Sequence, residues 1–166
     1  YTEMLAGAYT TPVIYAEVTG VFSNTVFTDA YRGAGRPEAT YVVERLADEA
    51  ARRLGLAPDS IRRLNFIQPV QMPYQVPLGL VYDSGNFPRN LEVCQKLADW
   101  SGFAARRAQS EHKGRLRGIG ISSFVEKTGT FPEEVADIRF HRGGEVSVHV
   151  GTMGSGQGHE TAFAQL

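Results

Sequence analysis

The sequence predicts an α+β fold, in which packed helices accompany mixed β-sheets. Segments rich in β-branched and aromatic residues occur at 12–21 and 145–150, and such segments favour strands. Between them, the apolar residues of 39–54 recur at helical spacing. Eighteen glycines and eight prolines in 166 residues indicate many loops. We therefore expect a loop-rich protein of the α+β class.

The composition argues against several kinds of partner. Seventeen Lys and Arg against eighteen Asp and Glu give a net charge of −1, which offers no attraction to nucleic acid or to an acidic membrane. We find no run of about 18 apolar residues and no signal-peptide pattern, so we predict a cytoplasmic protein without a membrane span. The single cysteine, Cys94, excludes an internal disulfide and a thiolate-held iron–sulfur cluster within the chain. Its neighbours predict a packed helix residue rather than a nucleophile.

The first part of the chain is predicted to form two strands and a loop. Residues 12–21 are typical of a strand, 22–24 of a turn, and 25–28 of a second short strand. The segment that follows, 29–39, contains two arginines and two glycines and is predicted to be a loop that leads into a helix.

Helices are expected in the middle of the chain. Pro37 stands where the first helical residue would be, and helical spacing continues to Leu54, before Gly55. The apolar face of this helix consists of Val42, Val43, Leu46, Ala50 and Leu54. Further helices are predicted at 58–64, 90–100 and 104–113, with Gly102 between the last two. The proline-rich segment 65–87 is predicted to be a long ordered connector.

The character of the sequence changes near Gly114. Strands are predicted at 115–125, 135–141 and 145–150, and a hairpin turn at 143–144 joins the last two.

This change is the candidate domain boundary, and it gives domains 1–113 and 114–166. The chain begins with Tyr1 rather than methionine and ends at Leu166, roughly one helical turn after a glycine-rich loop. We therefore expect it to be a segment of a longer polypeptide.

The glycine-rich loop, 151–161, has the pattern of an anion-binding turn. Four of its residues are glycines: 151, 154, 156 and 158. A predicted strand precedes the loop, and a helix is predicted to begin near His159. Glycines let the backbone approach a ligand closely, and the first N–H groups of a helix attract anionic oxygens. The pattern predicts a nucleotide-like or phosphorylated cofactor.

The identity of that cofactor stays open on spacing alone. A P-loop requires Lys and a hydroxyl residue where this chain has Gln157 and Gly158, so no point charge is available for terminal phosphates. A Rossmann fingerprint requires a third glycine spacing that the loop lacks, and an acidic residue on a later strand. A glycine turn that only joins a strand to a helix is a further alternative.

Few other residues suggest chemistry by their pattern. Arg32 and Arg36 lie beside glycines in the loop 29–39, and an unobstructed guanidinium can stabilise developing negative charge. His159 is predicted to be a capping or hydrogen-bonding residue. Glu126 and Glu160 could act as bases, but nothing in the sequence singles out either. The remaining histidines, His112, His141 and His149, lack partners at metal-ligand spacing.

Two long motifs together resemble one enzyme family. The segments 29–39 (DAYRGAGRPEA) and 151–161 (GTMGSGQGHET) closely resemble the large subunit of the molybdenum hydroxylases. This is the family of xanthine dehydrogenase, aldehyde oxidase and carbon monoxide dehydrogenase. The segments 82–87 and 114–120 are also similar to that family, and the resemblance covers essentially the whole chain in the expected order. It implies parts of two molybdopterin-binding domains.

The resemblance implies a cofactor and a set of binding residues. The family's large subunit holds molybdenum on a molybdopterin, in bacteria usually in the cytosine dinucleotide form. The residues that match its cofactor loop are Gly156, Gln157, Gly158, His159 and Thr161. Arg32 matches an arginine that faces the substrate pocket and steadies charge during catalysis. No metal ligand is implied within this chain.

The resemblance also implies a reaction and partners. The family hydroxylates a small-molecule substrate, such as an aldehyde or an N-heterocycle, with oxygen derived from water. Electrons leave through iron–sulfur clusters and FAD on partner subunits or domains, so a hetero-oligomer, dimeric in the parent protein, is expected. The cofactor carries the hard chemistry and the protein orients the reactants. Alternatives are a dinucleotide-dependent (NAD or FAD) oxidoreductase and a non-catalytic scaffold.

Two departures qualify this resemblance. Carbon monoxide oxidation in the family depends on a copper-holding cysteine directly after the loop arginine, and this chain has Gly33 there. We therefore predict no true CO oxidation. The family's catalytic glutamate would lie beyond Leu166 and an earlier cofactor loop before Tyr1, so neither role is assigned to Glu126 or Glu160. The chain alone is accordingly expected to be inactive.

Overall fold

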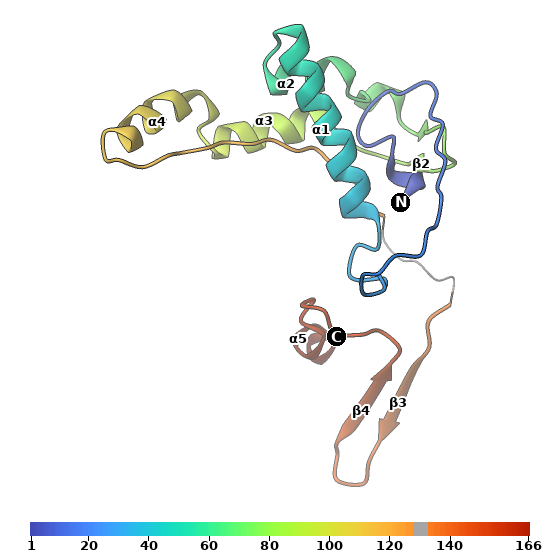
Figure 1. Cartoon of the computed structure of the whole chain (residues 1–166). Helices are drawn as coiled ribbons and strands as arrows, with labels where there is room; N and C mark the ends of the chain where they lie inside the picture. Colours follow the sequence, from blue (N-terminus) through green and yellow to red (C-terminus); the bar gives the residue numbers. More distant parts are fainter. Residues whose placement is uncertain (128–132) are drawn as a thin grey trace. The chain divides into compact units, whose positions relative to one another are not determined.

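The structure is a computed structural model that describes residues 1–127 and 133–166 (Figure 1). The chain divides into two compact units: unit 1 is Tyr1–Thr28 with Gly33–Glu126, and unit 2 is Asp29–Arg32 with Lys127–Leu166. The helices are α1 (Arg36–Leu54), α2 (Pro58–Asn65), α3 (Phe87–Leu97), α4 (Phe103–Glu111) and α5 (His159–Gln165), with short 3-10 turns at Thr2–Met4, Pro69–Gln71 and Trp100–Gly102. The strands are β1 (Tyr74–Gln75), β2 (Val81–Tyr82), β3 (Ala136–Phe140) and β4 (Val146–Val150). This mixture of helices and small sheets confirms the α+β class.

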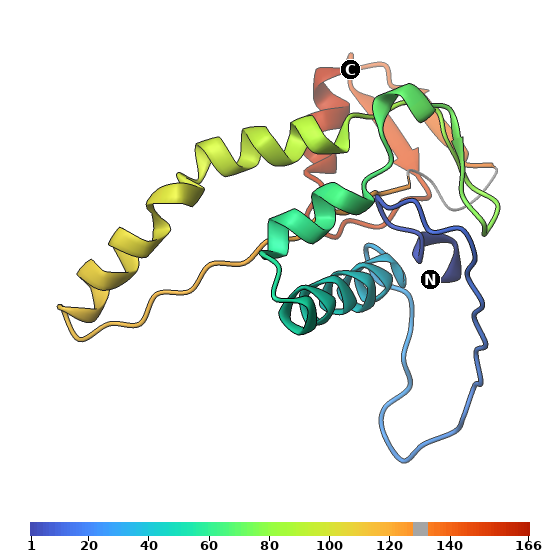
Figure 2. The same cartoon turned by 90° about the horizontal axis from the view of Figure 1, so that it is seen from above.

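The bounds of α1 agree with the prediction, and the residues expected at its two ends determine them. Pro37 lies in its first turn and Glu38 complements the positive helix N-terminus. At the other end Gly55 adopts the left-handed conformation (φ 66°), and its N–H bonds the carbonyls of the last turn. Figures 1 and 2 both show α2 lying beside α1.

The apolar face predicted for α1 is only partly the face that is buried. Of its residues, Val43 packs against the core, whereas Leu46 and Leu54 are exposed. The fully buried residues of this helix are Ala39, Glu44 and Ala51, two small residues and a carboxylate that the spacing of large apolar residues did not reveal.

The connector contains elements that the sequence did not predict. β1 and β2 pair antiparallel, with Tyr74 opposite Tyr82. Helix α3 begins at Phe87, earlier than predicted, because the side chain of Asn86 accepts a hydrogen bond from Arg89 N (3.0 Å) and so caps the helix. In Figures 1 and 2, α4 follows α3 after a bend.

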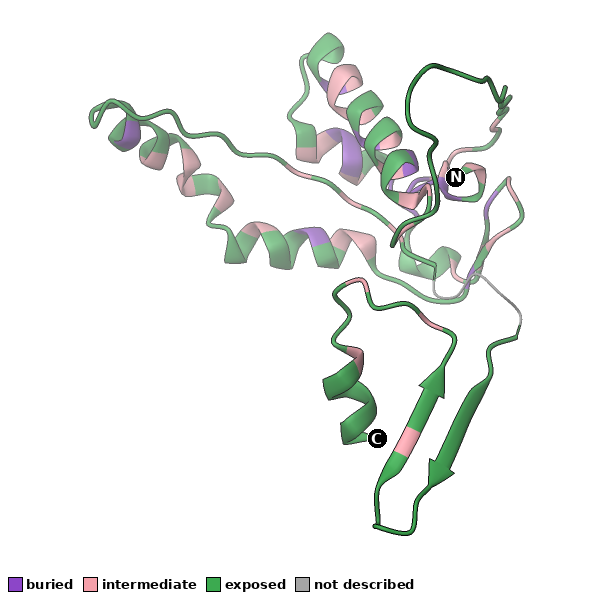
Figure 3. Ribbon diagram, turned by 60° about the horizontal axis from the view of Figure 1, so that its bottom comes forward, coloured by how far each residue is buried: buried purple, intermediate pink, exposed green. Residues whose placement is uncertain are grey.

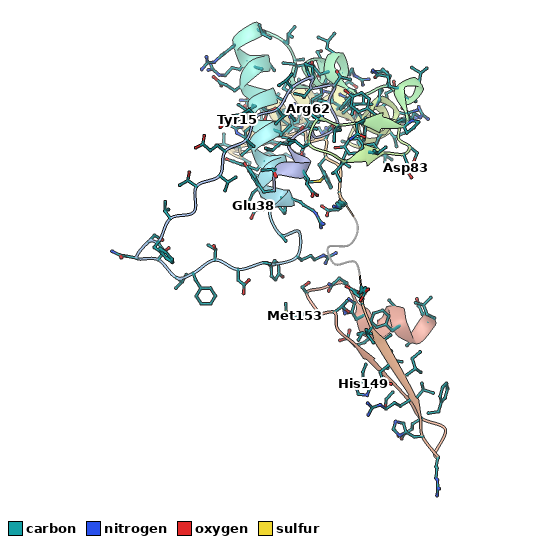
Figure 4. The ribbon with its side chains drawn as sticks, turned by 90° about the vertical axis from the view of Figure 1, so that its right-hand side faces the viewer. Tyr15, Glu38, Arg62, Asp83, His149 and Met153 are labelled. Atoms are coloured by element: carbon teal, nitrogen blue, oxygen red, sulfur yellow. The ribbon has the colours of Figure 1, made fainter. Side chains whose placement is uncertain are left out.

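Three strand predictions are wrong. Residues 12–21, 25–28 and 115–125 form no strand and pair with no other strand among the described residues. Tyr15, labelled in Figure 4, stands on the first of these segments with an exposed ring. A strand needs a neighbour for its backbone hydrogen bonds, and β-branched composition does not supply one.

Unit 2 confirms the predicted hairpin. In β3 and β4, Ala136 lies opposite Val150 and Phe140 opposite Val146, and the turn between them contains Gly144 at φ 82°. Residues directly opposite each other share a face of the pair, so one face carries only apolar side chains. The other face carries Asp137, Arg139, Ser147 and His149. His149 is labelled in Figure 4, and Figure 3 shows the hairpin as almost wholly exposed.

Two further expectations concern single features. Cys94 lies on α3 as predicted, but its side chain is exposed, so the prediction of a packed residue is wrong. Among the described residues, no helix has both the length and the apolar character that crossing a membrane requires.

Candidate functional site

The glycine-rich loop joins β4 to α5 in unit 2, as the sequence predicts. Gly156 (φ 97°) and Gly158 (φ 73°) adopt a conformation that other residues rarely take. Gly158 caps α5, and its carbonyl accepts hydrogen bonds from Thr161 N (3.1 Å) and Ala162 N (2.9 Å). The glycines are therefore needed to turn the chain from the strand into the helix.

The side chain of Gln157 holds this loop in shape. Its Oε1 accepts a hydrogen bond from Ser155 N (2.6 Å), and its Nε2 donates to the carbonyl of Met153 (3.3 Å). Met153 is labelled in Figure 4. A primary amide has two N–H donors, so one remains for a ligand. Gln157 thus organises the loop in addition to any contact that it makes with a cofactor.

Arg32 lies against the same loop. Its Nη1 donates a long hydrogen bond of 3.4 Å to the carbonyl of Ser155, across 123 residues of sequence. A Cβ atom at Gly156 would lie 3.5 Å from that Nη1. Arg32 and Ser155 both belong to unit 2, so this contact between the two motifs singled out in the sequence lies within one compact unit.

The remaining predicted loop residues have local roles in α5. The ring of His159 stacks on Phe163, one helical turn later, with centroids 5.0 Å apart. Thr161 contributes its backbone N–H to the helix start, and its side chain is exposed. Glu160 lies in the first turn, where negative charge favours the helix. In the part of the chain that the structure describes, no group of three or more His, Cys, Asp or Glu could hold a metal ion.

The turn after Arg32 is tightly built. Gly33, Ala34 and Gly35 all have positive φ (100°, 38° and 90°), and this conformation is strained for Ala34. A Cβ atom at Gly33 would lie 2.8 Å from the ring carbons Cγ and Cδ of Pro37. Position 33 therefore excludes any side chain unless the start of α1 moves.

Arg36 and Glu126 form an ion pair that sequence reasoning missed. Arg36 Nη1 lies 2.9 Å from Glu126 Oε1. The sequence offered both residues separately, one as an anion-binding arginine and one as an unassigned base. Nothing in their spacing linked them, because the contact joins segments far apart in the chain.

A buried polar network was also missed. Arg62, labelled in Figure 4, is fully buried and bonds Glu44 Oε2 (2.8 Å) and Asp48 Oδ1 (3.0 Å). The hydroxyl of Tyr9 donates to Glu44 Oε1. Burial acts to lower the pKa of Arg62, but its bonds to Glu44 and Asp48 raise it overall. Burial, together with the bond to Glu44, raises the pKa of Tyr9 above its ordinary value. Helical periodicity carries no signal for a buried charge.

Two pockets of unit 1 lie away from the predicted site residues. One of about 330 Å³ lies between α3 and the segment 120–124, and Cys94 lines it. Another of about 420 Å³ is bordered by Arg36, Tyr41 and Phe124. Neither is lined by Arg32 or by the residues of 156–161.

The loop residues fit a polar cofactor. A Cβ atom at Gly154 or Gly158 would meet no heavy atom within 4 Å, so the backbone there is open to close approach. The hydroxyl of Thr152 is buried and has no hydrogen-bond partner among the described residues. A buried hydroxyl without a partner is costly, so it offers a donor and an acceptor to an arriving polar group.

Comparison with known proteins places these features in context. A family described as "Molybdopterin cofactor-binding domain" matches residues 1–66, and a second family with the same description matches residues 93–166.

The chain is similar over its whole length to the carbon monoxide dehydrogenase large chain of Afipia carboxidovorans, with 38% identity and 23% of that relative covered. It is 29% identical to the nicotine 6-hydroxylase large subunit of Paenarthrobacter nicotinovorans, covering 96% of this chain and 21% of the relative. The solved structure of a Cu,Mo-CO dehydrogenase superposes with a TM-score of 0.67 at 34% identity, over 97% of this chain and 23% of that one. The chain thus spans less than a quarter of the length of these proteins.

Proposed function

Because the chain belongs to the family of molybdopterin-binding large subunits, the molybdenum hydroxylases, we propose that it is a segment of a hydroxylase that oxidises a small organic substrate. The oxygen added to the substrate comes from water, and the electrons pass to iron–sulfur and flavin groups. The contact of Arg32 with the loop at Ser155 and Gly156 carries this proposal, because it joins the expected substrate arginine to the expected cofactor loop.

The loop between β4 and α5 is the proposed cofactor-binding element. Gly156 and Gly158 give a ligand access to the backbone, Gln157 keeps one amide N–H, and His159 and Thr161 stand at the helix start. The cofactor is molybdopterin, in its cytosine dinucleotide form, and when bound it supplies the oxidation–reduction chemistry. The chain's own contribution is to bind and orient this group.

Arg32 is the proposed catalytic residue of this segment. Among the described residues its guanidinium donates one long hydrogen bond, so further donors can serve a substrate oxygen or ring nitrogen that gains negative charge. We propose an aldehyde or an N-heterocycle as substrate. The relative named nicotine 6-hydroxylase supports the second class.

We further propose that the enzyme does not oxidise carbon monoxide, although one relative carries that name. The resemblance places a copper-holding cysteine at position 33, where this chain has glycine, and the only cysteine is Cys94. The packing of Pro37 against position 33 supports this proposal, since a cysteine side chain would have no room.

The assembly is proposed on the same grounds. Residues 1–113 are the C-terminal part of a first molybdopterin-binding domain with its connector, and residues 114–166 begin a second. One cysteine cannot hold an iron–sulfur cluster, so clusters and FAD belong to partner subunits or domains. The parent is a cytoplasmic hetero-oligomer that forms a dimer.

The test uses the purified full-length protein with its partner subunits. Quinoline, nicotinate and benzaldehyde are supplied with a dye as electron acceptor, and heterocycle turnover is repeated in water labelled with oxygen-18. We expect the label in the hydroxylated product, and a loss of about 100-fold or more in kcat for Arg32→Ala. Oxidation that requires added NAD would favour a dinucleotide-dependent enzyme. Electron transfer from carbon monoxide would refute the proposal about that substrate.

A further inference from the structure

The ion pair between Arg36 and Glu126 stands where the chain leaves unit 1. Glu126 is the last residue of that unit before Lys127, and Gly33 is the residue at which the chain re-enters it. The Arg36 side chain is only 17% exposed and that of Glu126 is 49% exposed, with 2.9 Å between the charged atoms. The pair is therefore partly shielded from water, which distinguishes it from the fully solvated pairs that contribute little.

Arg36 is rigidly connected to the residue that follows Arg32. The N–H of Arg36 donates to the carbonyl of Gly33 (2.9 Å), and Pro37 packs against the α-carbon of Gly33 so closely that no Cβ fits. Residues 33–37 thus form one block with the first turn of α1. Arg32 is attached directly to that block.

The segment that leads to Glu126 is anchored by the buried network. Ser123 N donates to Glu44 Oε2 (2.8 Å), and Arg62 Nη2 donates to the carbonyl of Ile121 (3.2 Å). The acceptor Glu44 and the donor Arg62 in these two bonds are the partners of the buried ion pair. The segment that ends at Glu126 is therefore fixed to α1 and α2, although it forms no strand.

We infer that Arg36 and Glu126 are positioning residues for the proposed catalytic residue Arg32. Their ion pair links the block that carries Arg32 to a segment held by the Glu44–Arg62 pair, so it fixes the backbone from which the guanidinium projects. A small displacement of a charged catalytic group weakens catalysis strongly. This inference rests on the role proposed above for Arg32.

The first test measures how stably the turn from Gly33 to Arg36 is held, in the full-length protein with cofactor and partner subunits. Glu126→Gln removes the charge and keeps the shape of the side chain. Glu111→Gln is the matched control, because Glu111 pairs with Arg107 at 3.0 Å on α4 and is equally exposed, at 51%. We expect hydrogen exchange in the peptide containing the Arg36 amide to become about tenfold faster in Glu126→Gln and to stay unchanged in Glu111→Gln.

The second test separates positioning from general stability by a double-mutant cycle. With quinoline or benzaldehyde as substrate, Glu126→Gln should lower kcat about tenfold in the wild-type background and less than about twofold when Arg32 is already lysine. The exchanged pair Arg36→Glu with Glu126→Arg should recover most of the lost activity.

Two outcomes would overturn the inference. One is that Glu126→Gln matches Glu111→Gln in exchange and in kcat, and the other is that its effect on kcat is equal in both Arg32 backgrounds. Failure of the proposed function would look different, because Arg32→Ala would then leave turnover intact. The exchange measurement does not depend on the substrate.

Discussion

At the scale of single residues, the buried tyrosines link stability to alkaline pH. Tyr9 and Tyr82 are both buried, and burial raises the pKa of each phenol, with the Glu44 carboxylate raising that of Tyr9 further. The folded state retains these protons at pH values where the unfolded chain loses them. The contribution of the two phenols to stability is therefore fully present below about pH 10 and is lost as the pH rises above that value.

Replacing Tyr9 with phenylalanine should flatten this dependence. Between about pH 9 and pH 11, one retained phenolic proton costs the folded state up to about 1.4 kcal/mol per pH unit, and Tyr9→Phe removes that contribution. Thermal unfolding of the full-length large subunit across this range measures the effect. Tyr15→Phe is the control, because the ring of Tyr15 is exposed and should leave the slope as in the wild type. Equal slopes for the Tyr9→Phe and wild-type proteins would contradict the account.

At the scale of elements, the Glu44–Arg62 pair joins α1 to α2. Glu44 is 6% exposed, and its carboxylate accepts bonds from Tyr9, Arg62 and Ser123, which belong to three separate segments. A buried pair of this kind tolerates poorly the loss of one partner, because the other charge is then left unpaired away from water.

This arrangement predicts different effects for two glutamates on the same helix. Glu44→Gln should destabilise unit 1 by about 3–5 kcal/mol, since Arg62 loses its counter-charge. Glu49→Gln should change stability far less, because Glu49 pairs with Arg52 and Arg53 on the solvent side of α1. Denaturant unfolding, monitored by hydrogen exchange of the α1 amides, measures both changes in stability. A smaller loss for Glu44→Gln than for Glu49→Gln would refute the role assigned to the buried pair.

The elements divide into those that the sequence predicts well and those that it does not. Helix α1 and the β3–β4 hairpin are local structures, and residues such as Pro37, Gly55 and Gly144 determine their ends. The segments 12–21 and 115–125 have strand composition, but strand formation depends on a partner elsewhere. Local patterns therefore sufficed for α1, α2 and the hairpin, and failed where pairing is long-range.

The same distinction applies to the candidate site. The two motifs around Arg32 and Gln157 could be found in the sequence, because glycine turns and the resemblance of both segments point to them. The contact between Arg32 and Ser155, the Arg36–Glu126 pair and the buried Arg62 could not, because each depends on chain segments that meet only after folding.

At the scale of the whole molecule, burial is distributed unevenly between the two units. All buried apolar residues lie in unit 1, and none of the described residues of 127–166 is buried (Figure 3). The apolar face of the β3–β4 hairpin includes Ile138, Phe140 and Val148, all exposed. A two-stranded hairpin is at best marginally stable unless such a face is covered.

Hydrogen exchange of the isolated chain 1–166 should show this difference. We expect the amides of β3 and β4 to exchange at least about 100-fold faster than those in the middle of α1, because few apolar contacts oppose opening of the hairpin. In the full-length protein the same hairpin should be protected. Equal protection of hairpin and helix in the isolated chain would show that unit 2 is stable by itself.

The central claim is that the loop between β4 and α5 holds a molybdenum cofactor, and cofactor content tests it most directly. Molybdenum and oxidised pterin are measured in the full-length protein for wild type, Gln157→Ala and the control Gln109→Ala, which changes an exposed glutamine on α4. We predict near-stoichiometric molybdenum in the wild type and the control. Gln157→Ala should retain clearly less, because it loses the bonds to Ser155 and Met153 that shape the loop. A well-folded wild-type protein without molybdenum, or full molybdenum content in Gln157→Ala, would contradict the account.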